Sequence, residues 1–131
     1  MPSDRIERRK NLRNSLKQDA ELTLTEKSVY KGTTKNISFS GVYMYCADAK
    51  SIPVGETGFF KIFIQAQQQT EIISFTCQVI RTDDKGVGLK FIDIDLEGYQ
   101  NFKNLMLYNS SDPDKLLADL EESPGLDIRK S

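Results

Sequence analysis

The feature that most constrains the fold is an alternation of apolar and polar side chains that recurs in short segments. Residues 73–80 (ISFTCQVI) have apolar side chains at every second position, namely Ile73, Phe75, Cys77 and Val79. Neighbouring side chains of a strand point to opposite faces, so this pattern predicts a strand with one buried face. Comparable strand-like segments occupy residues 20–26, 28–37, 41–46, 59–65 and 86–91.

Turn-forming residues separate several of these predicted strands, at residues 54–58, 66–70 and 82–86. About six short strands at this spacing favour an antiparallel barrel or sandwich over βαβ units. At 131 residues the chain is long enough for one domain with a single core. We therefore expect one mainly β domain.

After the last predicted strand the apolar residues change their spacing. Residues 95–108 place Leu96, Tyr99, Phe102 and Met106 three or four positions apart. This is the apolar stripe of a helix that packs against the barrel. Asp95 is the expected N-cap of that helix.

A second, shorter helix is predicted from Pro113 to Glu121, with Asp112 as its cap. Its leucines at positions 116, 117 and 120 face either the barrel or a partner. We expect the last six residues to be disordered. Residues 109–131 then form an acidic C-terminal extension that follows the core at residues 19–108.

Charge is distributed unevenly along the chain. The net charge of −1 combines +4 in residues 1–18, −2 in residues 19–108 and −3 in residues 109–131. The basic leading segment indicates a small or local anionic partner, because a long polyanion would need a basic stripe on the folded body. The alternative is that residues 1–18 are a solvated basic tail.

The composition argues against an enzyme. The chain contains no histidine, which is the commonest general base near neutral pH, and none of the familiar nucleophile or phosphate-loop motifs. Acidic pairs such as Asp83 and Asp84 lie next to predicted turns, where aspartate serves as a turn or cap residue. Cys46 and Cys77 match no metal spacing, so we expect reduced core thiols and no bound metal or cofactor.

No apolar run approaches the roughly 18 residues that a membrane-spanning helix requires. The first residues are charged where a secretory signal would be apolar. We therefore expect a cytoplasmic protein that does not insert into membranes.

One of two short motifs precedes the predicted β region, and the other lies where its second predicted strand ends and its third begins. Arg9 and Arg13 form Arg-x-x-x-Arg, and Arg8 stands directly before the pair. Residues 36–41 (NISFSG) form Asn-x-Ser-x-x-Gly, with Asn36, Ser38 and Gly41 as its fixed positions. Alone, the second motif is also compatible with a simple hairpin corner.

Together with the strand and helix pattern over residues 5–108, these motifs resemble the PilZ domain family. The resemblance implies a six-stranded antiparallel β-barrel with a C-terminal α-helix packed on it. It also implies a bacterial receptor for the second messenger cyclic di-GMP. The ligand-binding residues implied are those of the two motifs, namely Arg8, Arg9, Arg13, Asn36, Ser38 and Gly41.

Arginine suits such a ligand, which carries two phosphates and two guanines. A guanidinium donates paired hydrogen bonds to a phosphate or to a guanine edge, and it stacks on a purine face. The resemblance also suggests Arg81 as a further contact, although a surface charge on a strand explains that residue equally well. Arg5 and Arg9 provide a competing Arg-x-x-x-Arg frame.

In PilZ-like domains an arginine directly before the pair is associated with two ligand molecules per domain. Arg8 therefore implies that two cyclic di-GMP molecules bind here, whereas the competing frame, which Asp4 precedes, implies one. We expect the ligand to order the flexible segment 1–18 and to pass the signal to an unknown downstream protein.

Two other functions fit parts of the sequence. A small β-barrel that binds nucleic acid could use Tyr43 and Tyr45 for stacking, but the net charge of residues 19–108 is negative and we do not expect nucleic acid as a partner. A PilZ adaptor that acts only through protein–protein contacts is the second alternative. Such adaptors usually lack the motif residues that this chain has.

Overall fold

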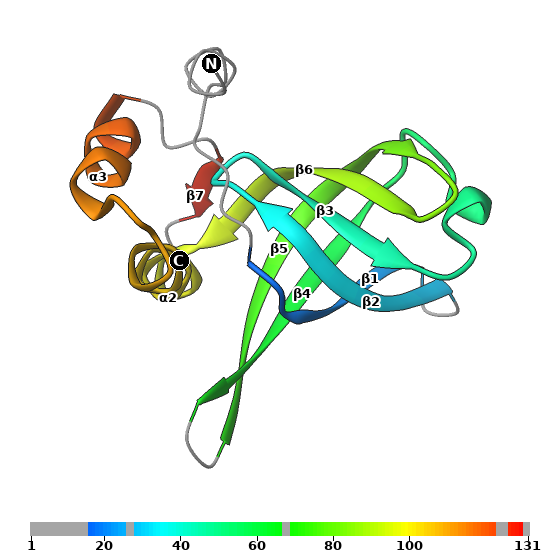
Figure 1. Ribbon diagram of the computed structural model, residues 1–131. Helices are drawn as coiled ribbons and strands as arrows, with labels where there is room; N and C mark the ends of the chain where they lie inside the picture. The colour runs from blue at the N-terminus through cyan, green and yellow to red at the C-terminus, as the bar shows by residue number, and fades with distance from the viewer. Residues whose placement is uncertain (1–15, 26–27, 67–68, 123–125, 130–131) are drawn as a thin grey trace, which may run out of the picture.

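Six antiparallel strands close into a β-barrel (Figure 1). The computed structural model describes residues 16–25, 28–66, 69–122 and 126–129. The strands are β1 (Asp19–Thr25), β2 (Ser28–Ile37), β3 (Gly41–Cys46), β4 (Thr57–Ala66), β5 (Gln69–Thr82) and β6 (Gly86–Asp95). Their order in the sheet is β3-β2-β1-β4-β5-β6, and pairing of β3 with β6 closes the barrel. The predicted six-stranded antiparallel barrel is confirmed.

The alternation in the sequence determines which side chains fill the barrel. The apolar residues of β5 that were predicted to share one face are all buried, namely Ile73, Phe75, Cys77 and Val79. Phe75 stacks on Phe91 of β6 with 4.0 Å between the ring centroids. The outward side chains of the same strands are polar or exposed, so the face that the alternation predicted as buried is the one that forms the core.

Helix α2 (Leu96–Tyr108) follows β6 and lies at one end of the barrel (Figure 1). Asp95 is its N-cap, as predicted, and accepts a hydrogen bond of 2.7 Å from the backbone N–H of Gly98. Phe102 is buried against Phe75, with ring centroids 4.9 Å apart. The prediction was wrong for Leu96, which is 49% exposed. Helical side chains tilt toward the N-terminus of the helix. The side chain of Leu96, the first residue, therefore projects beyond the helix rather than onto the barrel.

Helix α3 (Pro113–Glu122) has Asp112 as its predicted cap, with a hydrogen bond of 3.2 Å from the backbone N–H of Lys115. Leu116 and Leu120 join the hydrophobic core, and Leu117 is exposed. The second predicted helix is therefore confirmed.

The expectation of disorder after this helix was wrong for residues 126–129. Strand β7 (Asp127–Arg129) pairs in parallel with the end of β6. Leu126 is buried before it, and the Arg129 side chain lies 3.1 Å from the carboxylate of Asp93. Helices α2 and α3 lie between β6 and β7 in the chain and form the long connection that a parallel pair requires.

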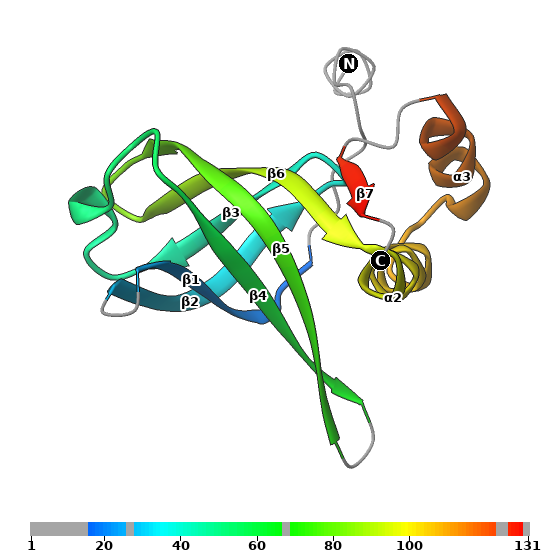
Figure 2. The same cartoon turned by 180° about the vertical axis from the view of Figure 1, so that it is seen from behind.

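The hairpin of β4 and β5 projects beyond the other strands (Figure 2). Its pairing continues as far as Ala66 with Gln69, whereas β6 pairs only with residues Thr76–Thr82 of β5. No helix among the described residues is long and apolar enough to span a membrane.

Candidate functional site

A row of four residues crosses the outer face of the barrel on neighbouring strands. Asn36 of β2 pairs with Tyr43 of β3, Tyr43 pairs with Gly88 of β6, and Gly88 pairs with Arg81 of β5. Directly paired residues in a sheet present their side chains on the same face. The pairing therefore brings the predicted residues Asn36 and Arg81 onto one face, although 45 positions separate them in the sequence.

The turn between β2 and β3 contains the rest of the second motif. The backbone N–H of Ser38 donates to the carbonyl of Gly41 over 2.9 Å, and the Ser38 hydroxyl accepts from the backbone N–H of Ser40 over 3.2 Å. Ser38 is only 2% exposed, so its hydroxyl lies within the turn. A Cβ at position 41 would lie 2.4 Å from the carbonyl oxygen of Leu89. The close approach of β3 to β6 therefore excludes any side chain at Gly41.

Arg81 lies over the ring of Tyr43, with the guanidinium carbon 5.4 Å from the ring centroid. The Tyr43 hydroxyl donates a 2.6 Å hydrogen bond to the carboxylate of Asp83. The same carboxylate oxygen accepts from the backbone N–H groups of Lys85 and Gly86, each over 2.9 Å. Asp83 is thus the turn residue that the sequence predicted, and it also orients a tyrosine from another strand.

Next to these side chains is a hollow of about 290 Å³. Its lining residues are Ser40, Gly41, Val42, Tyr43, Ile80, Arg81, Gly88, Leu89 and Lys90. Lys35 adds a third cation nearby, with its Nζ atom 5.7 Å from the centroid of the Tyr43 ring. The local charge is therefore positive, although residues 19–108 carry a net negative charge. An anionic ligand would be favoured here.

The contact between Tyr43 and Asp83 changes the acidity of both groups. Burial, and then the hydrogen bond to Asp83, raise the pKa of Tyr43 to about 12. The hydrogen bond from Tyr43, followed by those from the backbone of Lys85 and Gly86, lowers the pKa of Asp83. Both shifts widen the pH range over which the Tyr43 phenol is protonated and the Asp83 carboxylate is ionised.

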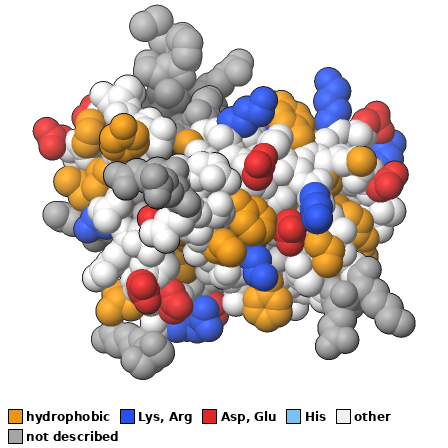
Figure 3. All heavy atoms as spheres, turned by 90° about the horizontal axis from the view of Figure 1, so that it is seen from below, with side chains coloured by type: hydrophobic (Ala, Val, Ile, Leu, Met, Phe, Trp, Pro, Cys, Tyr) orange, Lys and Arg blue, Asp and Glu red, His pale blue; other side chains and the backbone are white. Residues whose placement is uncertain are grey.

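Tyr43 does not provide the open stacking surface that a nucleic-acid-binding barrel would need. Its side chain is 7% exposed, while the neighbouring Tyr45 is 38% exposed and meets it edge-on, with centroids 5.5 Å apart. On the face seen in Figure 3, basic and acidic side chains are interspersed, and its described residues form no basic stripe.

Residues 16–18 attach the N-terminal side of the chain to β2. Leu16 is buried, and its carbonyl accepts a hydrogen bond from the hydroxyl of Thr34. The backbone N–H of Gln18 donates to the same hydroxyl over 2.9 Å, and the N–H of Thr34 donates to the carbonyl of Gln18, also over 2.9 Å. Residues 16–18 are thus fixed to β2 two positions before Asn36.

The predicted ligand residues of the leading segment lie outside the described residues. These are Arg5, Arg8, Arg9 and Arg13. Of the predicted residues that the structure describes, Asn36, Gly41 and Arg81 meet on the outer face, and Ser38 shapes the turn between Asn36 and Gly41. The sequence analysis did not assign Tyr43, Asp83 or Gly88 to this arrangement, because only the strand register brings them together.

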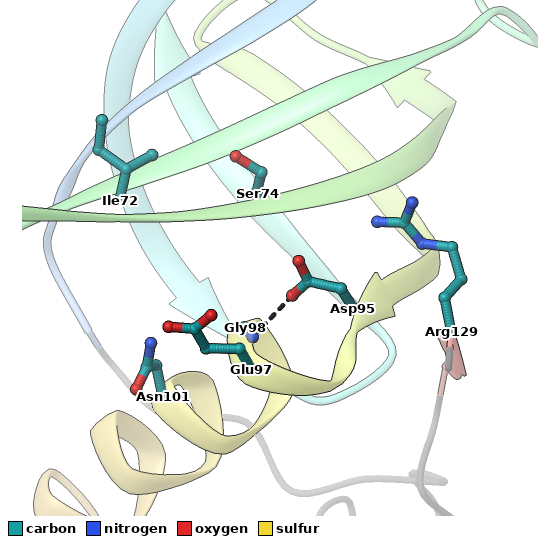
Figure 4. A pocket seen from close by; sticks show the side chains of 7 residues that line it. All are labelled: Ile72, Ser74, Asp95, Glu97, Gly98, Asn101 and Arg129. Carbon is teal, nitrogen blue, oxygen red and sulfur yellow. Dashed lines mark hydrogen bonds between the residues drawn. The ribbon is translucent and has the colours of Figure 1, made fainter. Parts of the chain in front are cut away.

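A second hollow, of about 260 Å³, lies elsewhere, between β5, the start of α2 and β7 (Figure 4). Two of its polar side chains are already engaged, since Asp95 caps α2 and Arg129 pairs with Asp93. None of the predicted site residues lines it. Among the described residues, no cluster of cysteine and acidic side chains could hold a metal ion.

Comparison with known proteins supports the interpretation of the fold. A family model for the PilZ domain matches residues 7–108. The chain is similar in structure to the Bacillus subtilis inhibitor of motility MotI/DgrA, with a TM-score of 0.64 and 21% sequence identity. That similarity covers 77% of this chain and 50% of the other, so the chain spans half the length of the Bacillus protein.

Two further solved structures are PilZ domains. The domain of YcgR from Escherichia coli, solved with c-di-GMP, has a TM-score of 0.60 and 12% identity, and the similarity covers 88% of this chain and 98% of that one. The domain of CeSA from a cellulose-synthesizing bacterium has a TM-score of 0.50 and 18% identity, with 72% and 92% covered. No curated protein sequence matches the chain. Because the family model spans most of the sequence and the structure is the expected barrel with its helix, the chain belongs to the PilZ domain family.

Proposed function

We propose that this protein is a stand-alone receptor for cyclic di-GMP. The observation that carries the proposal is the row of Asn36, Tyr43, Gly88 and Arg81 beside a basic hollow. Residues 16–18 are bonded to Thr34 of β2, the strand that carries Asn36. Arg13 is three residues before Leu16, and three residues of extended chain span at most about 11 Å, so Arg13 is tethered close to this strand.

In this proposal the ligand lies between two groups of residues. Arg8, Arg9 and Arg13 in the segment 1–18 contact its phosphates and guanines from one side. Asn36 contacts a base edge from the barrel, and Arg81 offers a second guanidinium. Ser38 acts through the turn that it holds, and Gly41 allows the ligand to approach the backbone. The YcgR domain that was solved with c-di-GMP supports this choice of ligand.

The signal in this proposal is conformational. Ligand binding orders residues 1–18 against the barrel and creates or covers a surface for an unknown downstream protein. The acidic extension at residues 109–131 is a candidate for part of that surface. The protein acts in the cytoplasm as a receptor and has no catalytic activity or cofactor of its own.

Isothermal titration calorimetry with cyclic di-GMP tests the proposal. Arg9→Ala and Arg13→Ala should each weaken binding at least about tenfold, because each removes charge-assisted hydrogen bonds. Lys10→Ala in the same segment is the matched control and should change affinity little. A parent protein that binds no cyclic di-GMP at moderate salt would disprove the receptor function. If both arginine variants bind like the parent, the assigned frame is wrong, and Arg5 and Arg8 should be substituted next.

The same titration measures how many ligands bind. We propose two cyclic di-GMP molecules per domain, since Arg8 adds a third guanidinium for a stacked ligand pair with four phosphates. Arg8→Leu should then shift the stoichiometry toward one while some binding remains. A stoichiometry of one in the parent protein would contradict the stacked pair without affecting the receptor assignment.

A further inference from the structure

Arg81 is held in place by an aromatic ring rather than by a carboxylate. Its guanidinium carbon lies 5.4 Å from the centroid of the Tyr43 ring. Within the described part of the chain, Arg81 takes part in no ion pair or hydrogen bond of its side chain. A guanidinium that rests on a ring keeps its N–H donors available for a ligand, whereas one paired with a carboxylate does not.

The ring of Tyr43 is itself fixed from its far end. Its hydroxyl donates to Asp83 over 2.6 Å, and two backbone N–H groups of the β5–β6 turn bind the same carboxylate oxygen. The absence of a side chain at Gly86 is necessary for this contact, because a Cβ there would lie 2.8 Å from the Tyr43 hydroxyl oxygen. The three hydrogen bonds engage Asp83 with the tyrosine and the turn, and the carboxylate acts on Arg81 only through its charge, without an ion pair.

Gly88 makes room for the arginine side chain. It lies between Tyr43 and Arg81 in the row, and a Cβ at this position would lie 3.0 Å from Cγ and 3.2 Å from Nε of Arg81. The Arg81 side chain thus passes over Gly88, where β6 has no side chain. It lines the same hollow as Ser40, Gly41 and Lys90.

We propose that Tyr43, fixed by its hydrogen bond to Asp83, is a positioning residue that holds Arg81 in the orientation in which it contacts cyclic di-GMP. This inference rests on the proposed function and extends it to residues outside the two motifs. A long side chain that is already ordered loses less rotational freedom when the ligand binds, so the ring increases affinity without touching the ligand.

A double-mutant cycle measured by calorimetry tests the inference. Tyr43→Leu removes the ring and should weaken cyclic di-GMP binding about tenfold, nearly as much as Arg81→Ala. Once Arg81 is alanine, adding Tyr43→Leu should cause no further loss. Tyr45→Leu is the matched control, because Arg81 does not lie over that ring, and it should weaken binding much less than Tyr43→Leu, since Tyr45 contacts only the edge of the Tyr43 ring.

Two milder variants keep the test valid if Tyr43→Leu unfolds. Tyr43→Phe and Asp83→Asn retain the ring, and each should weaken binding about threefold, because the ring becomes less well fixed. Nuclear magnetic resonance of the ligand-free protein provides a readout independent of binding. The Arg81 side-chain protons should have ring-current shifts that are lost in Tyr43→Leu and kept in Tyr45→Leu.

The outcomes separate the two proposals. If the parent binds cyclic di-GMP and Tyr43→Leu binds equally well, or if its loss is undiminished in the Arg81→Ala background, the positioning role is overturned and the receptor function stands. If the parent binds no cyclic di-GMP, both proposals fall.

Discussion

At the scale of single residues, the proposed binding face, which is the row of Asn36, Tyr43, Gly88 and Arg81 with the hollow beside it, depends on positions that have no side chain. Gly41 lets β3 approach β6, and Gly88 leaves space for Arg81. Neither needs an unusual backbone conformation, because Gly55 is the only described glycine with a positive φ. The requirement at both positions is space, so even alanine should be disfavoured where the neighbouring atom is a backbone carbonyl, as it is at Gly41.

The phenol of Tyr43 should titrate late. Burial and the hydrogen bond to Asp83 raise its pKa to about 12, above the usual value near 10. The folded protein therefore retains a proton that the unfolded chain releases between these two values. The stability that this proton provides is complete below pH 10 and disappears as the pH rises through 12.

Ultraviolet titration of the phenolate checks this prediction. The late-titrating component should be missing in Tyr43→Phe and should move to lower pH in Asp83→Asn. If the component that Tyr43→Phe removes instead titrates near pH 10, Tyr43 is not shielded.

At the scale of elements, β7 attaches the C-terminal extension beside the binding turn. Asp93 of β6 pairs with β5 on one side and with β7 on the other, so β7 occupies the edge of β6 that β3 also uses. Along that edge the backbone N–H of Phe91 donates to the carbonyl of Ser40 over 2.9 Å. The turn of the second motif therefore lies between β3 and β7 on one strand edge.

Deletion of residues 123–131 should destabilise the barrel without unfolding it. The deletion removes buried Leu126, whose burial contributes about 2 kcal/mol, together with the pairing of β7. Urea unfolding should therefore show a lower midpoint. Arg129→Ala keeps Leu126 and the pairing of β7, and it should lower the midpoint less than the deletion, although it leaves the buried Oδ1 atom of Asp93 without its ion-pair partner. An unchanged midpoint after the deletion would mean that β7 adds nothing to stability.

The elements could be predicted where the pattern in the sequence is long enough. Strand β5 has four apolar residues in alternation, and α2 has a stripe that spans three turns, so both were identified. Strand β7 has three residues, of which only Ile128 is apolar, so no alternation could identify it in the sequence.

The binding face could be predicted only as far as its motifs extend. Asn36, Ser38 and Gly41 lie within six positions, which a local pattern can detect. Tyr43 and Asp83 are 40 positions apart, and Arg81 meets Gly88 through an irregular register with a bulge. Their contact depends on the way the strands pair, which no local pattern specifies. The arginines of the first motif lie outside the described residues and stay a prediction.

At the scale of the whole molecule, the closed barrel shields its interior from reagents. Cys77 is fully buried, burial raises the pKa of its thiol to about 12, and no disulfide links it to Cys46. Since the thiolate is the reactive form, Cys77 should react with a thiol reagent at neutral pH only when the barrel opens.

Labelling with an aromatic disulfide reagent checks this prediction. The folded protein should release one equivalent of thiol, from the partly exposed Cys46, and unfolding in urea should release the second. The Cys46→Ser variant is the control and should react only on unfolding. Rapid reaction of both thiols in the folded protein would contradict a closed barrel.

The closure of the barrel by β3 and β6 has a consequence for folding. The two strands are distant in the sequence, and their seam divides the binding face, with Gly41 and Tyr43 on one side and Gly88 and Lys90 on the other. Long-range pairings of this kind are slow to form. Because the face includes residues of both strands, it is complete only after β3 has paired with β6. A nucleotide bound across the seam would therefore stabilise the closed barrel. At a free concentration a hundredfold above its dissociation constant, it would raise the free energy of unfolding by about 2.7 kcal/mol.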